Sequence, residues 1–298
     1  MQRTIICLLL WMFSLSARAD LKVFSCEPEW AALVNEIGSG HVDVYSATTA
    51  LQDPHYIQAR PSLIAKIRSA RLVVCSGAQL EIGWLPALLA KGNNPAVQPG
   101  TPGFLEASKL VRRLEVSASV DRAQGDLHPE GNPHVQTNPH NISLIAPVLS
   151  QRMAQLDPAN AAVYTVALAD FMGRWETAMA GWDARAAPLK GKRIIPHHKS
   201  WAYLEDWLGL QELANLEPLP GVPPTASHLS ELLSRFGQGG ADFIVRTSFQ
   251  DEKASIWLAE RSGIPAVVLP LSPGGTVQAT DLFRMFDDIL DRLLGAKS

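Results

Sequence analysis

The chain has 298 residues, with 26 lysine and arginine residues against 29 aspartate and glutamate residues, and 47% of its residues are hydrophobic. This slightly acidic balance, without a basic cluster, argues against nucleic acid and anionic membrane surfaces as partners. A chain of this length exceeds one comfortable hydrophobic core, so we expect two domains.

The first 19 residues have the pattern of a secretory signal peptide. Arg3 precedes an apolar run from Ile5 to Leu15, and the small residues Ala17 and Ala19 form a cleavage signal. The run is too short to span a bilayer, and no cysteine follows a lipobox-like pattern. We therefore expect residues 1–19 to be removed and the remaining chain to be exported as a soluble protein without a transmembrane helix.

Short apolar strands alternate with helical patterns in the segment after this leader. Strands are predicted at Leu21–Cys26, Val42–Ala47 and Leu72–Ser76, and helices at Glu29–Ile37, Pro61–Ser69 and Glu81–Ala90. This alternation is typical of a parallel sheet that is covered by helices. We expect residues 20–156 to form an N-terminal α/β lobe.

A long helical pattern follows. Asp157 is a plausible N-cap and Pro158 suits the first helical position, and apolar faces then recur as far as Ala187. We expect residues 157–187 to form one helix that links two lobes.

The alternation restarts beyond this helix. Strands are predicted at Arg193–Pro196, Phe243–Thr247 and Ala266–Leu271, and helices at Ser200–Leu208, His228–Phe236, Lys253–Ser262 and Thr280–Leu294. We expect residues 188–298 to form a similar C-terminal α/β lobe. The predicted fold class is α/β, with two parallel sheets covered by helices, joined by one long helix and separated by a cleft. Ligands of such open sheets bind outside the carboxyl ends of the strands.

Three histidines occupy similar settings in this pattern. His55 in QDPH, His134 in GNPH and His198 in IIPHH each follow a proline or a short apolar run near a strand end. Because they are far apart in the sequence, only a fold that gathers distant strand ends could bring them together. Three imidazoles are most of a tetrahedral zinc site.

Two cysteines remain after the leader, and each ends a predicted strand. Cys26 and Cys75 could form a disulfide in an oxidising compartment if their strands are adjacent. Two free cysteines buried in the core would fit the same pattern equally well. Neither has the CxxC spacing of a zinc ligand.

Four further segments can be compared with a known family. They are QDPHYIQARPSLIAKIRSARLVVCSGAQLEIGWL, NPHVQTNPHN, HKSWAYLEDWLGL and EPLPGVPPTASHL. In this order they resemble the zinc and manganese branch of the periplasmic solute-binding proteins, the metal-binding subunits of ABC importers. The resemblance covers essentially the whole chain after the leader, and it implies a metal site in the cleft between two lobes.

The resemblance implies that His55, His134 and His198 are metal ligands. His198 matches the family motif better than His197 because the family's histidine directly precedes the following helix, although a slip of one residue would exchange the two. Manganese members tend to have a carboxylate at this third position. The histidine in this chain therefore favours zinc, which imidazole suits.

The fourth ligand is where the chain departs from the family pattern. Many relatives present an aspartate just after the last strand, where this chain reads VVLPLSPGGT without an acid. Asp281, at the end of the same loop, is our first candidate, although it is also a good helix N-cap. Asp251 is the second candidate, although it could be an exposed turn residue, and a water molecule is the remaining option.

Two more histidines lie near His134 in the sequence. His128 and His140 in DLHPEGNPHVQTNPHN lie among polar, glycine and proline residues. They are predicted either to capture zinc weakly from a mobile loop or to be solvated loop residues. The Pro/Gly-rich stretch Glu217–Thr225 is a second candidate mobile element.

The sequence therefore predicts a monomeric periplasmic protein that holds one Zn²⁺ between two lobes and delivers it to an ABC-transporter permease in the inner membrane. A periplasmic zinc chaperone is a further candidate partner. A metal-dependent adhesin or a zinc chaperone of the same fold would share these features. A zinc hydrolase fits less well, because no HExxH-like spacing of base and ligands is present, and we expect no catalytic residues.

Overall fold

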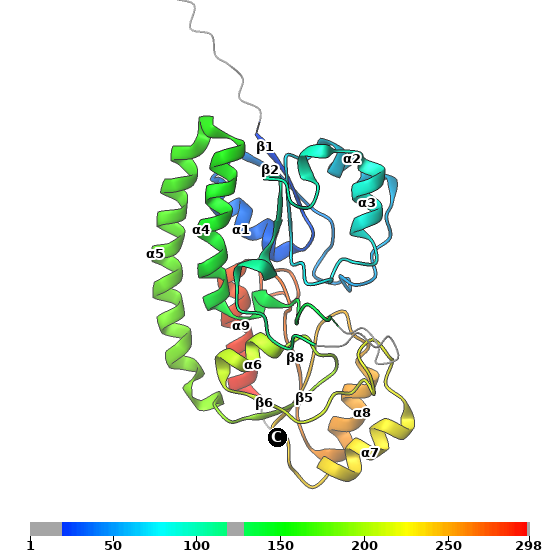
Figure 1. The fold of residues 1–298 in the computed structure, drawn as a ribbon. Coiled ribbons are helices and arrows are strands. Elements are labelled where there is room, and N and C mark those ends of the chain that lie inside the picture. Colours follow the sequence, from blue (N-terminus) through cyan, green and yellow to red (C-terminus); the bar gives the residue numbers. More distant parts are fainter. Residues whose placement is uncertain (1–19, 118–127, 297–298) are drawn as a thin grey trace, which may run out of the picture.

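The computed structural model of the chain describes residues 20–117 and 128–296, so the predicted signal peptide lies outside the described residues. In the described residues the strands form two four-stranded sheets, ordered β2-β1-β3-β4 and β6-β5-β7-β8, and every pairing is parallel. Each sheet forms one lobe, and long helices run beside both lobes (Figure 1). The predicted α/β class with two lobes and a long connecting helix is confirmed.

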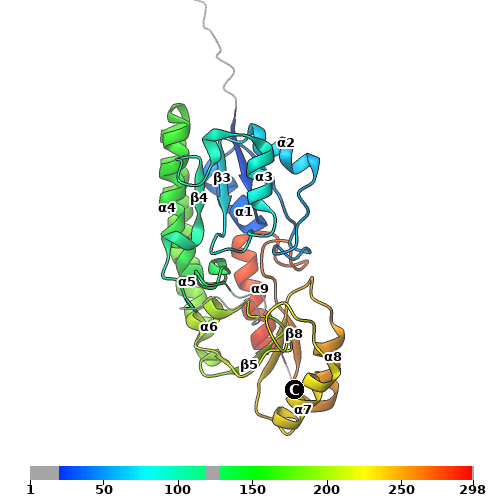
Figure 2. The ribbon, with the colours of Figure 1, turned by 45° about the vertical axis from the view of Figure 1, so that its right-hand side comes forward.

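The N-terminal lobe follows the predicted alternation closely. Its elements are β1 (Leu21–Ser25), α1 (Pro28–Gly38), β2 (Val42–Ser46), α2 (Pro61–Ser69), β3 (Leu72–Cys75), α3 (Leu85–Gly92) and β4 (Phe104–Glu106). Helices α2 and α3 cover one face of the sheet, whereas α1 lies on the other face beside the long helices (Figure 2). The sheet therefore has buried residues on both faces, as its continuous apolar strands require.

A disulfide joins Cys26 to Cys75 at the carboxyl ends of the neighbouring strands β1 and β3, with 4.8 Å between the two Cα atoms. The sequence left open whether these cysteines pair or remain free in the core. The parallel pairing of the two strands brings their ends together and makes the bond geometrically accessible.

Two long helices, α4 (Pro139–Leu156) and α5 (Ala161–Ala186), pack side by side along the molecule (Figure 1). The sequence predicted only the second of them. Asp157 does not cap α5 as expected, because its side chain accepts hydrogen bonds from the Tyr164 hydroxyl over 2.7 Å and from the Asn160 amide. A short 3₁₀ turn at Pro158–Asn160 precedes the helix instead.

The C-terminal lobe repeats the arrangement of the first. Its elements are β5 (Arg193–Pro196), α6 (Ala202–Leu208), β6 (Gln211–Glu212), α7 (Ala226–Phe236), β7 (Phe243–Arg246), α8 (Lys253–Ser262), β8 (Ala266–Val268) and α9 (Leu282–Gly295). Helices α7 and α8 lie together at the outer side of the lobe (Figure 2). Helix α9 packs against α5, where the Trp175 and Phe283 ring centroids are 4.8 Å apart.

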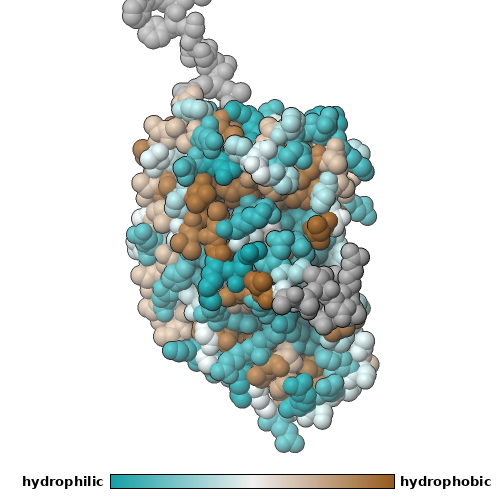
Figure 3. Space-filling model, viewed as in Figure 1, coloured by the Kyte–Doolittle hydropathy of each residue, from teal (hydrophilic) through white to brown (hydrophobic). Residues whose placement is uncertain are grey.

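The largest cluster of buried apolar residues extends through both lobes, from Leu21 on β1 to Leu293 on α9, and smaller clusters fill the remaining side of each sheet. The face in Figure 3 is mostly hydrophilic, with apolar residues gathered mainly on the upper lobe. Among the described helices, none combines the length and the apolar character that crossing a membrane requires.

Candidate metal centre

The three histidines from separate motifs lie together between the lobes. The ring centroid of His55 is 5.7 Å from that of His134 and 5.4 Å from that of His198. The centroids of His134 and His198 are 6.4 Å apart. One ring nitrogen of each lies within 4.8 Å of the others. His55 follows β2, His198 follows β5, and His134 precedes α4, so strand and helix ends from both lobes contribute to the cluster.

Three hydrogen bonds hold the loops that carry these histidines. The buried indole of Trp84 donates to the carbonyl oxygen of Pro54, directly before His55, over 2.9 Å. The amide of Asn132 donates to the carbonyl oxygen of Lys199 over 2.8 Å, and its oxygen accepts the backbone N–H of His134. The cluster therefore rests on interactions within and between lobes that limit the freedom of each imidazole.

Two carboxylates accept hydrogen bonds from the Nδ1 atoms of two of these rings. Asp53 Oδ1 lies 2.7 Å from His55 Nδ1, and Glu217 Oε2 lies 2.7 Å from His198 Nδ1. Because a carboxylate can only accept, Nδ1 of each ring carries a hydrogen, and Nε2 is the nitrogen that could bind a metal ion when it is unprotonated. Burial acts to raise the pKa of Asp53, but the hydrogen bond and charge of His55 outweigh it and hold the pKa below its ordinary value.

His134 is the most buried member of the cluster, with 1% of its surface exposed. Within the described part of the chain, neither of its ring nitrogens has a hydrogen-bond partner. Burial, with smaller contributions from His55 and His198, holds the pKa of His134 well below its ordinary value, so the ring is neutral at pH 7. A buried polar group without a partner is costly, and a metal ion bound to its lone pair would remove that cost.

His128 and His140 have different locations, although the same role was predicted for both from the sequence. His128 Nε2 lies 3.1 Å from His55 Nε2, at the edge of the cluster. His140 lies in the first turn of α4 with its Nε2 3.3 Å from Asp183 Oδ1, and about half of its side chain is exposed. The structure thus brings His128, but not His140, to the candidate site.

The two acidic residues predicted as a fourth ligand do not join the cluster. Asp281 is the N-cap of α9, where its Oδ1 accepts the backbone N–H of Arg284 over 2.8 Å. Asp251 lines the same cavity as the histidines, but its Oδ1 accepts the backbone N–H of Lys253 and its side chain is largely exposed. Helix and turn geometry therefore determine where both carboxylates point.

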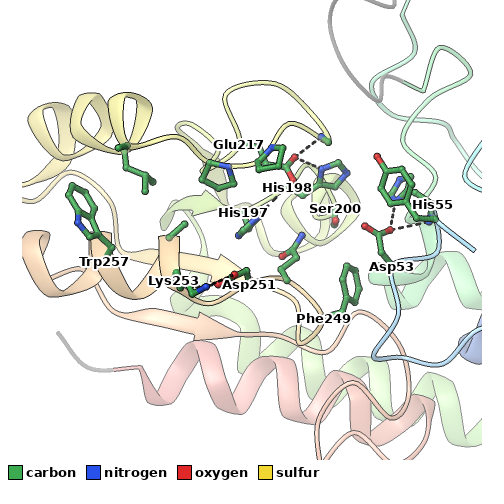
Figure 4. A pocket seen from close by; sticks show the side chains of 18 of the residues that line it. Asp53, His55, His197, His198, Ser200, Glu217, Phe249, Asp251, Lys253 and Trp257 are labelled. Atoms are coloured by element: carbon green, nitrogen blue, oxygen red, sulfur yellow. Dashed lines mark hydrogen bonds and ion pairs between the residues drawn. The ribbon is translucent and has the colours of Figure 1, made fainter.

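His197 and His198 are both buried but face different surroundings. His198 belongs to the cluster of three, whereas His197 points into the adjoining cavity with its Nε2 4.0 Å from Glu217 Oε1 (Figure 4). Burial lowers the pKa of His197, against the opposing charge of Glu217. This geometry agrees with the choice of His198 as the histidine of the motif, and its role as a metal ligand stays a prediction.

Three buried glutamates near the site had no part in the sequence prediction. The backbone N–H of Ser76 donates to Glu81 Oε1 over 2.8 Å and to Glu27 Oε2 over 3.2 Å. Burial raises the pKa of Glu29 to about 8 and that of Glu81 to about 7, and burial with the charge of Glu81 also raises that of Glu27. Glu27 and Glu29 lie on either side of Pro28 in CEPEW, directly after a predicted strand, and this position could have indicated two of the three buried acids.

Comparisons with known proteins agree with this architecture. The family described as "Zinc-uptake complex component A periplasmic" (ZnuA) matches residues 23–296. The "High-affinity zinc uptake system protein ZnuA" of Yersinia pestis is 24% identical over 241 residues, which cover 77% of this chain and 72% of that protein. The "Manganese ABC transporter substrate-binding lipoprotein PsaA" of Streptococcus pneumoniae is 22% identical over 259 residues, covering 85% and 80%.

Solved structures show the same fold. One described as "Crystal structure of ZnuA" superposes with a TM-score of 0.77 at 22% identity, covering 94% of this chain and all of that chain. A Mn-bound periplasmic metal-binding protein from Candidatus Liberibacter asiaticus gives a TM-score of 0.72 at 17% identity, covering 92% and 98%. Zinc and manganese proteins both occur among the relatives of this chain.

Proposed function

Since this chain belongs to the zinc-uptake complex component A (ZnuA) family of metal-binding ABC solute-binding proteins, we propose that it captures Zn²⁺ and delivers it to a membrane permease. The observation that carries the proposal is the convergence of His55, His134 and His198, with both ring nitrogens of His134 buried and without partners among the described residues. Zn²⁺ is the cargo of this site and is released unchanged.

The donor set supports zinc over manganese. Three neutral imidazoles suit zinc, whereas manganese is better served by carboxylate and water oxygens. The carboxylates of Asp53 and Glu217 bond to ring nitrogens, so they orient the histidines and balance the charge of the ion without being ligands themselves. His128 is the nitrogen donor nearest to the fourth coordination position, because its Nε2 is 3.1 Å from that of His55.

The proposed location is the periplasm, after removal of residues 1–19, with the permease in the inner membrane as partner and a zinc chaperone as a further donor or acceptor of the ion. We propose that the protein acts as a monomer. A hydrolase of the same fold would need a free general base next to a metal-bound water. The carboxylates of Asp53 and Glu217, which contact His55 and His198, are instead engaged in hydrogen bonds to these rings, which favours a carrier.

Metal analysis of the purified protein tests the proposal. We expect one zinc ion per chain, lost to a chelator and regained in preference to manganese. Replacing His55, His134 or His198 with alanine should each weaken zinc binding at least about 100-fold, or about 3 kcal/mol, whereas His197→Ala is the matched control and should change it little. Equal uptake of manganese, or a damaging His197→Ala with a silent His198→Ala, would contradict the assignment.

A further inference from the structure

The three histidines open onto a cavity that is much larger than a metal ion needs. Its volume is about 600 Å³, whereas a site for one water molecule needs only about 10–15 Å³ by the same measure. Figure 4 shows it extending from His55 and Asp53, past His197, to Trp257 on α8. Cavities of this size are typical of sites for small organic molecules.

The wall away from the histidines is mainly apolar. Its apolar residues come from α7, α8 and the adjoining loops, and the polar residues Gln250, Asp251 and Lys253 also line it: the apolar ones are Pro223, Pro224, Leu229, Phe249, Ala254 and Trp257. An apolar wall offers no ligand atom to a metal ion and no hydrogen-bond acceptor to the water bound to it. It would contact the carbon skeleton of an organic ligand and release water from that surface.

Besides the three clustered histidines, the buried His197 also lines this cavity. The His197 side chain is only 7% exposed and lines the cavity. Its Nδ1 is buried and has no hydrogen-bond partner among residues 20–117 and 128–296. Because this nitrogen has almost no accessible surface, only the exposed edge of the His197 ring can contact a ligand in the cavity, where it would lie against the organic part of that ligand.

We propose that the site accepts zinc together with a small amino-acid chelator, whose organic part occupies this cavity. The inference rests on the proposed function, because His55, His134 and His198 still hold the ion. The chelator's amine and carboxylate complete the coordination of zinc, which tolerates four or five ligands. They compete with His128 for the fourth position, and the rest of the molecule lies beside His197 against the apolar wall.

Native mass spectrometry with zinc and L-histidine as the probe chelator tests this proposal. The apo protein is incubated with zinc alone, with L-histidine alone and with both. We expect one zinc with zinc alone, no bound histidine without zinc, and one zinc plus one histidine when both are present. Zinc saturation without retained histidine would overturn the inference and leave the proposed function intact, whereas failure to bind zinc alone would overturn the proposed function first.

A pair of variants shows whether the histidine occupies the cavity. Ser230, an exposed residue on α7 that lines it, is replaced with tryptophan to fill the space, and Ser234, one turn further along α7 and outside the lining, receives the same change as control. Both variants should bind zinc as the wild type does. Ser230→Trp should retain about tenfold less histidine than Ser234→Trp. Equal retention would mean that the histidine contacts only the metal, and the proposal would be wrong.

Discussion

The hydrogen bond between Glu217 and His198 should contribute directly to zinc affinity. Glu217 Oε2 accepts from His198 Nδ1 over 2.7 Å and from the backbone N–H of Gly221 over 2.8 Å, and its side chain is only 13% exposed. In Glu217→Gln the amide oxygen can still accept both hydrogen bonds. The change therefore removes the negative charge while it preserves the shape and the link to the loop.

The expected loss is about 10- to 100-fold in zinc affinity, the usual effect of removing such an outer partner of a metal-bound histidine. This range corresponds to about 1.4–2.7 kcal/mol. The charge of Glu217 favours the ion electrostatically and makes the His198 ring a better donor, and both effects are strengthened by burial. The affinity is measured at pH 7.5 by competition with a zinc chelator of known affinity.

Asp251→Asn is the matched control for Glu217→Gln. Asp251 lines the same cavity and carries the same charge, but within the described part of the chain it pairs with Lys253 over 3.6 Å and makes no hydrogen bond to a histidine of the cluster. Its replacement should change zinc affinity less than about twofold, because an exposed charge is screened by solvent. If the two variants lose affinity equally, or if Glu217→Gln stays within about threefold of wild type, the outer carboxylate has no special role.

Three further predictions concern individual residues. His128→Ala should lower zinc affinity about tenfold and His140→Ala should not, as the same competition assay will show, since only His128 lies beside the cluster. Asp281→Ala should lower the free energy of unfolding by about 1 kcal/mol through the lost helix cap, measured in urea, and a large loss of zinc affinity would instead make it a ligand. In the apo protein, burial raises the pKa of Glu29 from 4.5 to about 8. The contribution of the protonated Glu29 carboxyl to the free energy of unfolding is therefore complete below pH 4.5 and is lost as the pH rises through about 8. Glu29→Gln should therefore stabilise the protein at pH 9 by up to about 5 kcal/mol and change it little at pH 5. Urea unfolding at both pH values measures this, and equal effects at the two would contradict the reasoning.

The strands of the two lobes were predictable where apolar runs were long enough. Leu21–Ser25 and Leu72–Cys75 are central strands, and their buried residues on both faces give a clear signal. The edge strands Phe104–Glu106 and Gln211–Glu212 have only three and two residues, too few for a pattern. Helix Pro139–Leu156 was missed because its proline-bounded start reads as a loop and Pro147 interrupts its interior.

The sequence was enough to predict that the three histidines of the candidate site lie together. It was not enough to predict which residues surround them. Each of His55, His134 and His198 has a local motif, and the fold gathers the ends of their elements. Asp53, two residues before His55, could have been recognised as its partner, but Glu217 reaches His198 only through the tertiary structure. The direction of a side chain such as Asp281, toward a helix or toward a metal, is decided by backbone geometry that the sequence does not display.

The continuous core from Leu21 to Leu293 has a consequence for how this protein unfolds. The final helix, α9, completes the same apolar cluster that the first strand begins, so a cut between the lobes would expose apolar surface on both fragments. Neither fragment is then expected to be stable alone, and thermal unfolding should occur as one cooperative step. An ion bound where the lobes meet stabilises this whole cooperative unit, so its binding free energy slows the proteolysis that requires global unfolding.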